Sequence, residues 1–154
     1  MAATTTTRAG TLDQSALKVT QAGIVSTLLA AFLLDALWPP AAIWVPLLAV
    51  VMLAGSVEPR LALFRQLYLR LLRPANLVRP RVVVDSMRPH AFAQQMGGTV
   101  LLLASLFLFP LGNALIGWGL VWVVIVLAFV NFAFNFCLGC QIFYQLERFG
   151  LVKA

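Results

Sequence analysis

Four long apolar runs constrain the fold of this chain more than any other feature of its sequence. Read at about 20 residues per membrane span, they extend over Ala22–Trp38, Ala41–Val57, Phe92–Leu111 and Ala114–Phe136. A segment in lipid must satisfy its own backbone hydrogen bonds, and a helix does this within the segment. The sequence therefore predicts an all-α membrane protein with four transmembrane helices in a single domain over residues 1–154.

The composition supports the same class. Of the 154 residues, 62% are hydrophobic and 10% are charged, whereas about a quarter of the residues in a soluble domain are charged. So few charged side chains cannot coat a water-soluble core, which excludes a soluble enzyme. Two cysteines cannot staple a secreted disulfide scaffold. The residues from Met1 to Arg8 lack the apolar segment of a signal peptide, so we expect the first span to stay in the protein.

The positions of the basic residues predict the topology. The links between spans one and two, Pro39-Pro40, and between spans three and four, Gly112-Asn113, contain no lysine or arginine. Each pair of spans is therefore a tight hairpin, and by the positive-inside rule both termini and the middle segment face the cytoplasm. The net charge of +6 then reflects topology, and we expect no nucleic-acid partner. The middle segment contains Arg60, Arg65, Arg70, Arg73, Arg79, Arg81 and Arg88.

An amphipathic pattern follows the second span. Leucines and aromatic residues recur at helical spacing among the arginines from Arg60 to Arg73, which is typical of a helix lying on a membrane surface. Arginines near the inner leaflet attract anionic lipid head groups at about 1 kcal/mol each. We therefore predict that Arg60, Arg65, Arg70 and Arg73 bind lipid, with a docking surface for a soluble partner as the alternative.

The two halves of the chain resemble each other. We divide the chain into a first hairpin with its interfacial helix (13–74), a basic linker (75–90) and a second hairpin (91–149). A shift of 74 positions superposes the spans, and a further offset of five residues places Leu63–Leu67 on Ile142–Leu146. An even number of spans per copy predicts parallel repeats related by an axis along the membrane normal. The matched pairs include Gln21 with Gln95, Gly23 with Gly97 and Trp44 with Trp118.

The sequence around the cysteines resembles a known family. Asn131-Phe132-Ala133-Phe134-Asn135 precedes Phe136-Cys137-Leu138-Gly139-Cys140, and Tyr144 follows a turn later. This end, and more weakly the region from Asp13 to Phe149, is similar to the small bacterial membrane proteins catalogued as domain of unknown function 4395. The resemblance implies a four-helix protein of the bacterial inner membrane, encoded near thioredoxin-like or sulfurtransferase proteins, with no established activity.

Cys137 and Cys140 are the main candidate site. Their i, i+3 spacing brings the Cα atoms near the distance that a disulfide needs. Counted from the outer tip, the pair lies at the cytoplasmic interface, where cytosolic reductants favour the dithiol. We expect both cysteines to follow one long helix, whose dipole opposes a thiolate, unless Gly139 breaks that helix. A functional dithiol, a buried structural pair and metal ligation completed by a partner all remain open.

Four other polar residues stand out. His90 lies at the depth of the cysteines and could stabilise a thiolate, although a solvated position at the start of a helix is the common case. Asp35 is the only acid within an apolar run, and its place before Trp38 predicts a hydrated hairpin end rather than a proton relay. Asn131 and Asn135, at i and i+4, should face one neighbouring helix and bond to it, with a ligand contact as the alternative.

Three classes of function remain. The first is thiol–disulfide or sulfur handling through Cys137 and Cys140 with a soluble partner, such as a thioredoxin-like or sulfurtransferase protein. The second is a non-catalytic accessory or assembly subunit of a larger membrane complex, and the third is a transporter of a small sulfur compound. The chain contains no nucleotide-binding loop, paired carboxylates or nucleophile triad. The sequence therefore predicts no cofactor or metal and assigns no enzyme class, while anionic lipids are an expected partner.

Overall fold

The four predicted spans are confirmed. The computed structural model describes residues 10–76, 82–85 and 87–151. Its long helices are α1 (Gln14–Leu37), α2 (Trp44–Val57, extended by the 3-10 turn η1, Pro39–Ile43), α4 (Met87–Leu108) and α5 (Ala114–Phe134), and all four are long and apolar enough to cross a membrane. Spans one and three begin earlier than the apolar runs do, because their first turns are polar but still helical.

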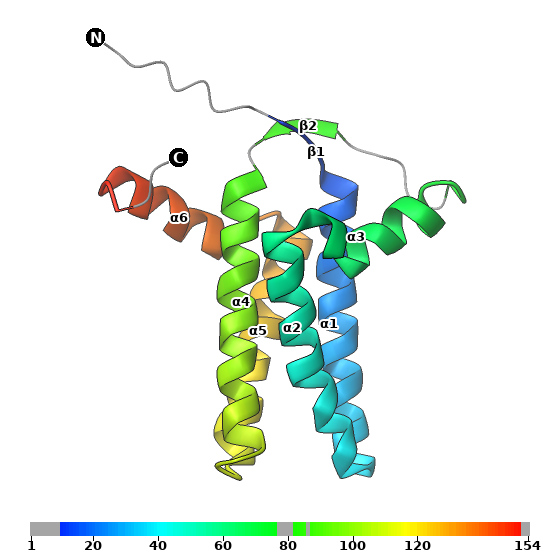
Figure 1. Ribbon diagram of the computed structural model, residues 1–154, viewed down its shortest axis with the longest axis vertical. Helices are drawn as coiled ribbons and strands as arrows, with labels where there is room; N and C mark the ends of the chain where they lie inside the picture. Colours follow the sequence, from blue (N-terminus) through cyan, green and yellow to red (C-terminus); the bar gives the residue numbers. More distant parts are fainter. Residues whose placement is uncertain (1–9, 77–81, 86, 152–154) are drawn as a thin grey trace.

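Shorter elements gather at one end of this bundle (Figure 1). After α2 come the 3-10 turn η2 (Pro59–Leu61), α3 (Leu63–Leu67) and its π-helical continuation η3 (Tyr68–Leu72), and α6 (Leu138–Arg148) follows α5. Two short strands, β1 (Gly10–Asp13) and β2 (Val82–Asp85), pair antiparallel across that end, which the sequence did not predict. We call this the basic end, because Arg60, Arg65 and Arg148 lie there, and the opposite one the hairpin end.

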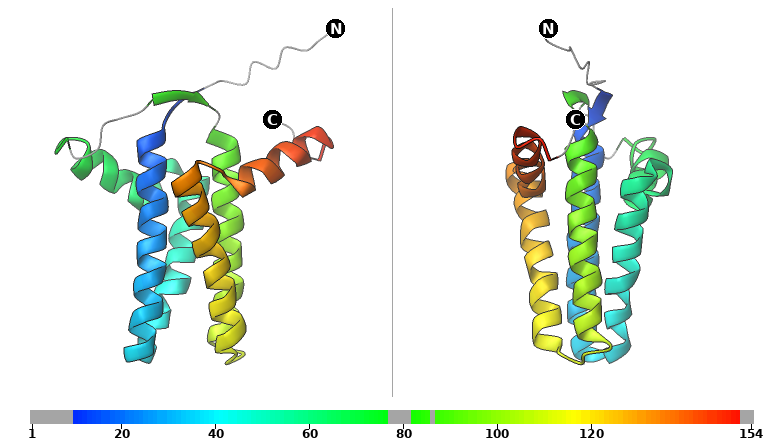
Figure 2. Two further views of the ribbon diagram at one scale, coloured as in Figure 1. Left: turned by 180° about the vertical axis from the view of Figure 1, so that it is seen from behind. Right: turned by 60° about the vertical axis from the view of Figure 1, so that its left-hand side comes forward.

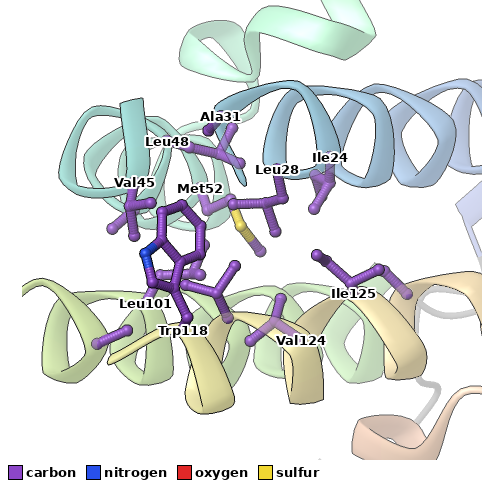
Figure 3. Packing of buried hydrophobic residues seen from close by; sticks show 14 of the residues in the cluster. Ile24, Leu28, Ala31, Val45, Leu48, Met52, Leu101, Trp118, Val124 and Ile125 are labelled. Carbon is purple, nitrogen blue, oxygen red and sulfur yellow. The ribbon is translucent and has the colours of Figure 1, made fainter. Parts of the chain in front are cut away.

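The bundle is held together by an apolar core along its axis (Figure 3). Helix α1 packs on α5, and α2 packs on α4 (Figure 2). Leu28, Val45, Leu101 and Val121, one from each span, have no exposed surface. Because lipid provides no hydrophobic force between helices, close packing of side chains such as these stabilises the bundle.

A hydrogen bond joins the two halves near the hairpin end. The Trp118 indole Nε1 donates to Asp35 Oδ2 at 3.1 Å, and the Phe32 ring stands edge-on to Trp118 with centroids 5.1 Å apart. The interpretation of Asp35 as a hydrated residue at a hairpin end is therefore incomplete, because one of its carboxylate oxygens accepts a hydrogen bond from Trp118 of the other half. Trp118 is buried and belongs to the apolar core of the bundle.

Two helical arms leave the basic end on opposite sides (Figures 1 and 2). Helix α3 with η3 forms the first arm and α6 the second. If α1 corresponds to α4, α2 to α5 and α3 to α6, the contact of α1 with α5 maps onto that of α4 with α2, and the contact of α1 with α3 onto that of α4 with α6. This is the arrangement expected of two parallel repeats. The predicted amphipathic segment is helical from Leu63 to Leu72, but the extended residue Ala62 separates this part from Arg60 in η2. Its contact with a membrane surface stays a prediction.

The first arm is tied to the start of α1. Tyr68 is fully buried, and its hydroxyl donates to Asp13 Oδ2 at 3.0 Å. The other oxygen of Asp13 accepts from the Ser15 backbone N–H at 3.0 Å and so caps α1. One carboxylate therefore fixes both the first turn of α1 and the position of the arm. Arg79 and Arg81 of the predicted basic linker lie outside the described residues.

Candidate dithiol site

The chain breaks its helix just before the cysteines. Helix α5 ends at Phe134, and Asn135 has φ 53° and ψ 27°, a left-handed conformation that asparagine tolerates better than most residues. The prediction that both cysteines follow one continuous helix is therefore wrong, and the break lies at Asn135 rather than Gly139. The prediction that Asn131 and Asn135 share a helix face is wrong for the same reason.

Cys137 caps the new helix α6. Its side-chain Sγ accepts a hydrogen bond from the Cys140 backbone N–H at 3.2 Å. The first turn of a helix has unpaired N–H groups and the positive end of the helix dipole, and both favour a negative charge on the capping atom. The dipole at this site thus supports a thiolate on Cys137 instead of opposing it.

The two cysteines form a disulfide in this structure. Their Cα atoms are 5.1 Å apart, inside the range of about 4.4–6.8 Å that a disulfide allows. Cys140 is buried, whereas Cys137 is only partly buried. A reagent from outside therefore reaches Cys137 more readily than Cys140.

Gly139 allows this turn to pack closely against α4. A Cβ atom added to Gly139 would lie 2.5 Å from Ala93 Cβ and 2.8 Å from Ala93 Cα. Such a contact with backbone is far shorter than van der Waals distance, so only glycine fits at this closeness. Further along the arm, the Phe143 ring packs on the Phe92 ring with centroids 5.5 Å apart. The glycine of the Cys-Leu-Gly-Cys motif thus permits a close approach of α6 to α4.

His90 lies beside the pair. It sits in the first turns of α4 just after the buried Pro89, a residue type that the start of a helix accepts. The His90 Nδ1 atom is 3.5 Å from Cys140 Sγ. His90 is therefore a residue at the start of a helix, as the common interpretation has it, and it also lies next to the cysteines, as the alternative interpretation requires.

The same three side chains are a possible set of metal ligands when the cysteines are reduced. One ligand atom each from His90, Cys137 and Cys140 lies within 4.8 Å of the others. Tetrahedral zinc takes four ligands, and within residues 10–76, 82–85 and 87–151 this group supplies three. Metal binding here would need a ligand from elsewhere.

A cavity of about 150 Å³ adjoins the disulfide. Its lining comes from α1, α2, α4, α5 and α6, and includes Cys137 and His90. Most of the lining is apolar, and it also includes the amide side chains of Gln21, Gln94 and Asn131. The site thus combines a disulfide, a histidine and a partly open apolar cavity at the basic end.

The comparisons with known proteins agree with the resemblance carried by the motif. The family model described as domain of unknown function (DUF4395) matches residues 12–148. The chain belongs to this family. No curated protein and no solved structure matches the chain. The family gives the four-span membrane architecture a name but assigns no activity.

Sequence reasoning found His90 and both cysteines but missed their local structure. Asn135 was the available signal, because asparagine is among the few residue types that end a helix in the left-handed conformation. With the helix ended there, Cys137 falls at the capping position of the next one. The close approach of Gly139 to Ala93 depends on residues far apart in the chain, and no sequence signal could have shown it.

Proposed function

We propose that this protein is a membrane thiol–disulfide exchange protein that uses Cys137 and Cys140 to pass two electrons to or from a soluble dithiol partner. The observation that carries this proposal is the disulfide at the start of α6, with Cys137 Sγ accepting from the Cys140 N–H. Helix N-termini activate cysteines in this way in thiol oxidoreductases. Two cysteines with a purely structural role would not need a helix N-terminus that stabilises a thiolate.

In the reducing direction, a thiolate of the partner attacks Sγ of Cys137, the less buried residue of the pair. The bond between Cys137 and Cys140 breaks, and a mixed disulfide forms on Cys137. Cys140 leaves with the electron pair and takes a proton from His90, whose Nδ1 is within reach at 3.5 Å. This step requires the tautomer with hydrogen on Nδ1.

The partner's second thiolate then attacks its own sulfur in the mixed disulfide. Cys137 is released as a thiolate, and the N–H of Cys140 stabilises that charge. The net result is a Cys140 thiol and a Cys137 thiolate in this protein and one disulfide in the partner, with two electrons transferred, while His90 recovers its proton from the solvent. In the opposite direction the Cys137 thiolate attacks a disulfide in the partner, and Cys140 resolves the mixed disulfide.

We place the basic end at the cytoplasmic face of a bacterial inner membrane. The support is the positive-inside rule, since the exposed Arg60, Arg70 and Arg148 all lie at this end. With Arg65 and Arg73, the arginines of the first arm are placed to bind anionic lipid there. A soluble thioredoxin-like protein in the cytoplasm would then reach Cys137.

The orientation is tested with single cysteines in a Cys137→Ser, Cys140→Ser background. Asn113→Cys at the exposed hairpin end should react with a membrane-impermeant maleimide added to intact cells, and Gln145→Cys on α6 should not. The reverse pattern would mean that the dithiol faces the periplasm, and the partner would have to be sought there.

The exchange itself is tested with the full chain in lipid nanodiscs and a reduced thioredoxin. After acid quenching and alkylation with a heavy maleimide, we expect the gain of two alkylated cysteines in this protein for each thioredoxin disulfide formed. The Cys137→Ser, Cys140→Ser variant should leave thioredoxin reduced. A disulfide that persists at every thioredoxin concentration would contradict the proposal and favour the accessory-subunit alternative.

A further inference from the structure

The cavity beside the disulfide has the size of a single ring. Its volume is about 150 Å³, and an apolar protein cavity of about this volume holds one benzene molecule. Ile24, Met52 and Val124 form part of its lining, and all three are buried residues of the core. The cavity therefore ends on the packed centre of the bundle and is no path through it.

Two amide side chains in the lining have no protein partner. Gln21 of α1 and Asn131 of α5 both line the cavity. Within the part of the chain that the structure describes, neither amide makes a hydrogen bond, whereas Gln94 nearby donates to the Met52 carbonyl at 3.0 Å. Both residues are only partly buried and their amide atoms keep some accessible surface, so a ligand in the cavity can reach them. A ligand with hydrogen-bond acceptors would satisfy both groups, and a lipid acyl chain would not.

The cavity also reaches the lipid-facing surface. Three of its lining residues, Met96 of α4 and Val123 and Leu127 of α5, are exposed apolar side chains within the spans. A molecule dissolved in the hydrocarbon can therefore enter between α4 and α5. Cys137 and His90 line the same cavity.

We infer that this cavity binds the head group of a quinone, a lipid-soluble carrier of two electrons. The inference rests on the proposed function and names the second substrate of the same site. A quinone ring matches the volume, its two carbonyl oxygens accept from the amides of Gln21 and Asn131, and its tail leaves through the lipid-facing mouth. The bound ring adjoins Cys137.

The reaction balances as a two-electron exchange. The thiols of Cys137 and Cys140 lose two electrons and two protons and form the S–S bond, while the two carbonyls of the quinone become hydroxyls of the quinol. His90 accepts the proton of Cys140 across 3.5 Å. A soluble dithiol that reduces the disulfide again would complete a cycle that moves electrons from the partner into the membrane.

The experiment uses the reduced full chain in lipid nanodiscs under anaerobic conditions, with a short-chain ubiquinone as the probe. We expect one quinone to be reduced, measured by its ultraviolet absorbance, for each pair of thiols lost to maleimide. Gln21→Leu and Asn131→Leu should each raise the quinone concentration for half-maximal rate roughly fivefold, the loss of one hydrogen bond. Gln95→Leu is the matched control, because Gln95 is the repeat counterpart of Gln21, is exposed and lies outside the cavity.

The outcomes separate this inference from the proposed function. If thioredoxin exchange proceeds and the quinone stays oxidised, or if Gln95→Leu weakens the reaction as much as Gln21→Leu, the quinone site is overturned and the exchange function stands. If the quinone binds with the expected sensitivity to Gln21 and Asn131 but neither substrate changes the thiol state, the exchange function is overturned. Size-exclusion profiles identical to the wild-type profile show that the leucine variants are folded.

Discussion

The half of the chain that contains α1 to α3 and the half that contains α4 to α6 build the same architecture with different chemistry. Each half is a hairpin of two spans followed by a helical arm at the basic end (Figure 1). In the first half the Phe64 ring of the arm lies over Gly23 of a span, and in the second half Gly139 of the arm lies against Ala93 of a span. In both halves a glycine thus allows the arm to lie close to the bundle. In the first half this glycine is in the span, and in the second half it is in the arm.

The reactive residues are confined to the second half. In the alignment that pairs Leu63–Leu67 with Ile142–Leu146, the positions of Cys137 and Cys140 correspond to Glu58 and Leu61. The first arm therefore packs on the bundle without a disulfide, which indicates that the fold of an arm does not require a disulfide. This difference favours a functional role for the cysteines over a structural one.

The largest effect is expected from separating the two cysteines. In Cys140→Ser the Cys137 thiolate should attack the disulfide of oxidised thioredoxin and hold it as a mixed disulfide, because the resolving sulfur is missing, and Cys137→Ser should trap none. Turnover should fall below detection in both variants. Leu61→Ser, at the corresponding position of the first half, should leave turnover unchanged. Non-reducing gels would show the mixed disulfide, and equal trapping by both cysteine variants would contradict the assigned roles.

A smaller loss is expected when the histidine is removed. His90→Ala deprives Cys140 of its proton donor, and we expect the exchange rate with thioredoxin to fall by roughly a hundredfold. The pH dependence of that rate should also change, because the variant lacks the titratable imidazole. Stopped-flow measurement of the wild type and of His90→Ala across pH 5 to 9 would show this. An unchanged pH profile would assign His90 a purely packing role.

The close contact between Gly139 of the second arm and Ala93 of α4 provides the next test. Gly139→Ala should destabilise the protein by roughly 1–3 kcal/mol and slow exchange, because the added methyl group overlaps Ala93 and moves Cys140 away from His90. Gly119→Ala is the control, since a Cβ at Gly119 meets nothing within 4 Å. Thermal unfolding in detergent compares the two, and equal stabilities would show that the arm shifts without cost.

The smallest effect is expected in the first arm. Tyr68→Phe removes the hydrogen bond to Asp13 and should cost about 1 kcal/mol without changing thiol exchange. Burial raises the pKa of Tyr68 above its ordinary value of 10.0, and the hydrogen bond and charge of Asp13 add to this. The neutral phenol is then favoured in the folded protein, so its stabilisation is complete below pH 10.0 and is lost as the pH rises through the raised pKa. Tyr68→Phe should lack this alkaline loss, and an identical loss in both proteins would assign it to another group.

The sequence predicted the spans well because hydrophobicity over about 20 residues is a local property. It also predicted the family and an arm between the hairpins. It could not predict the antiparallel pairing of Gly10–Asp13 with Val82–Asp85, since strands of four residues carry little pattern and their partner is distant in the chain. The contact between His90 and Cys140 depends on how α6 turns after Asn135, and a single left-handed residue decides that direction.

The central claim is that Cys137 and Cys140 act as one redox pair, and differential alkylation in membranes tests it most directly. Membranes are equilibrated with thiol–disulfide buffers of graded potential, acid-quenched, and alkylated with light and heavy maleimides for mass spectrometry. We expect both thiols to appear together in one two-electron transition, with about 30 mV per tenfold change in the ratio of dithiol to disulfide. Cysteines that stay in one state across the whole range, or that become alkylated independently of each other, would contradict the claim.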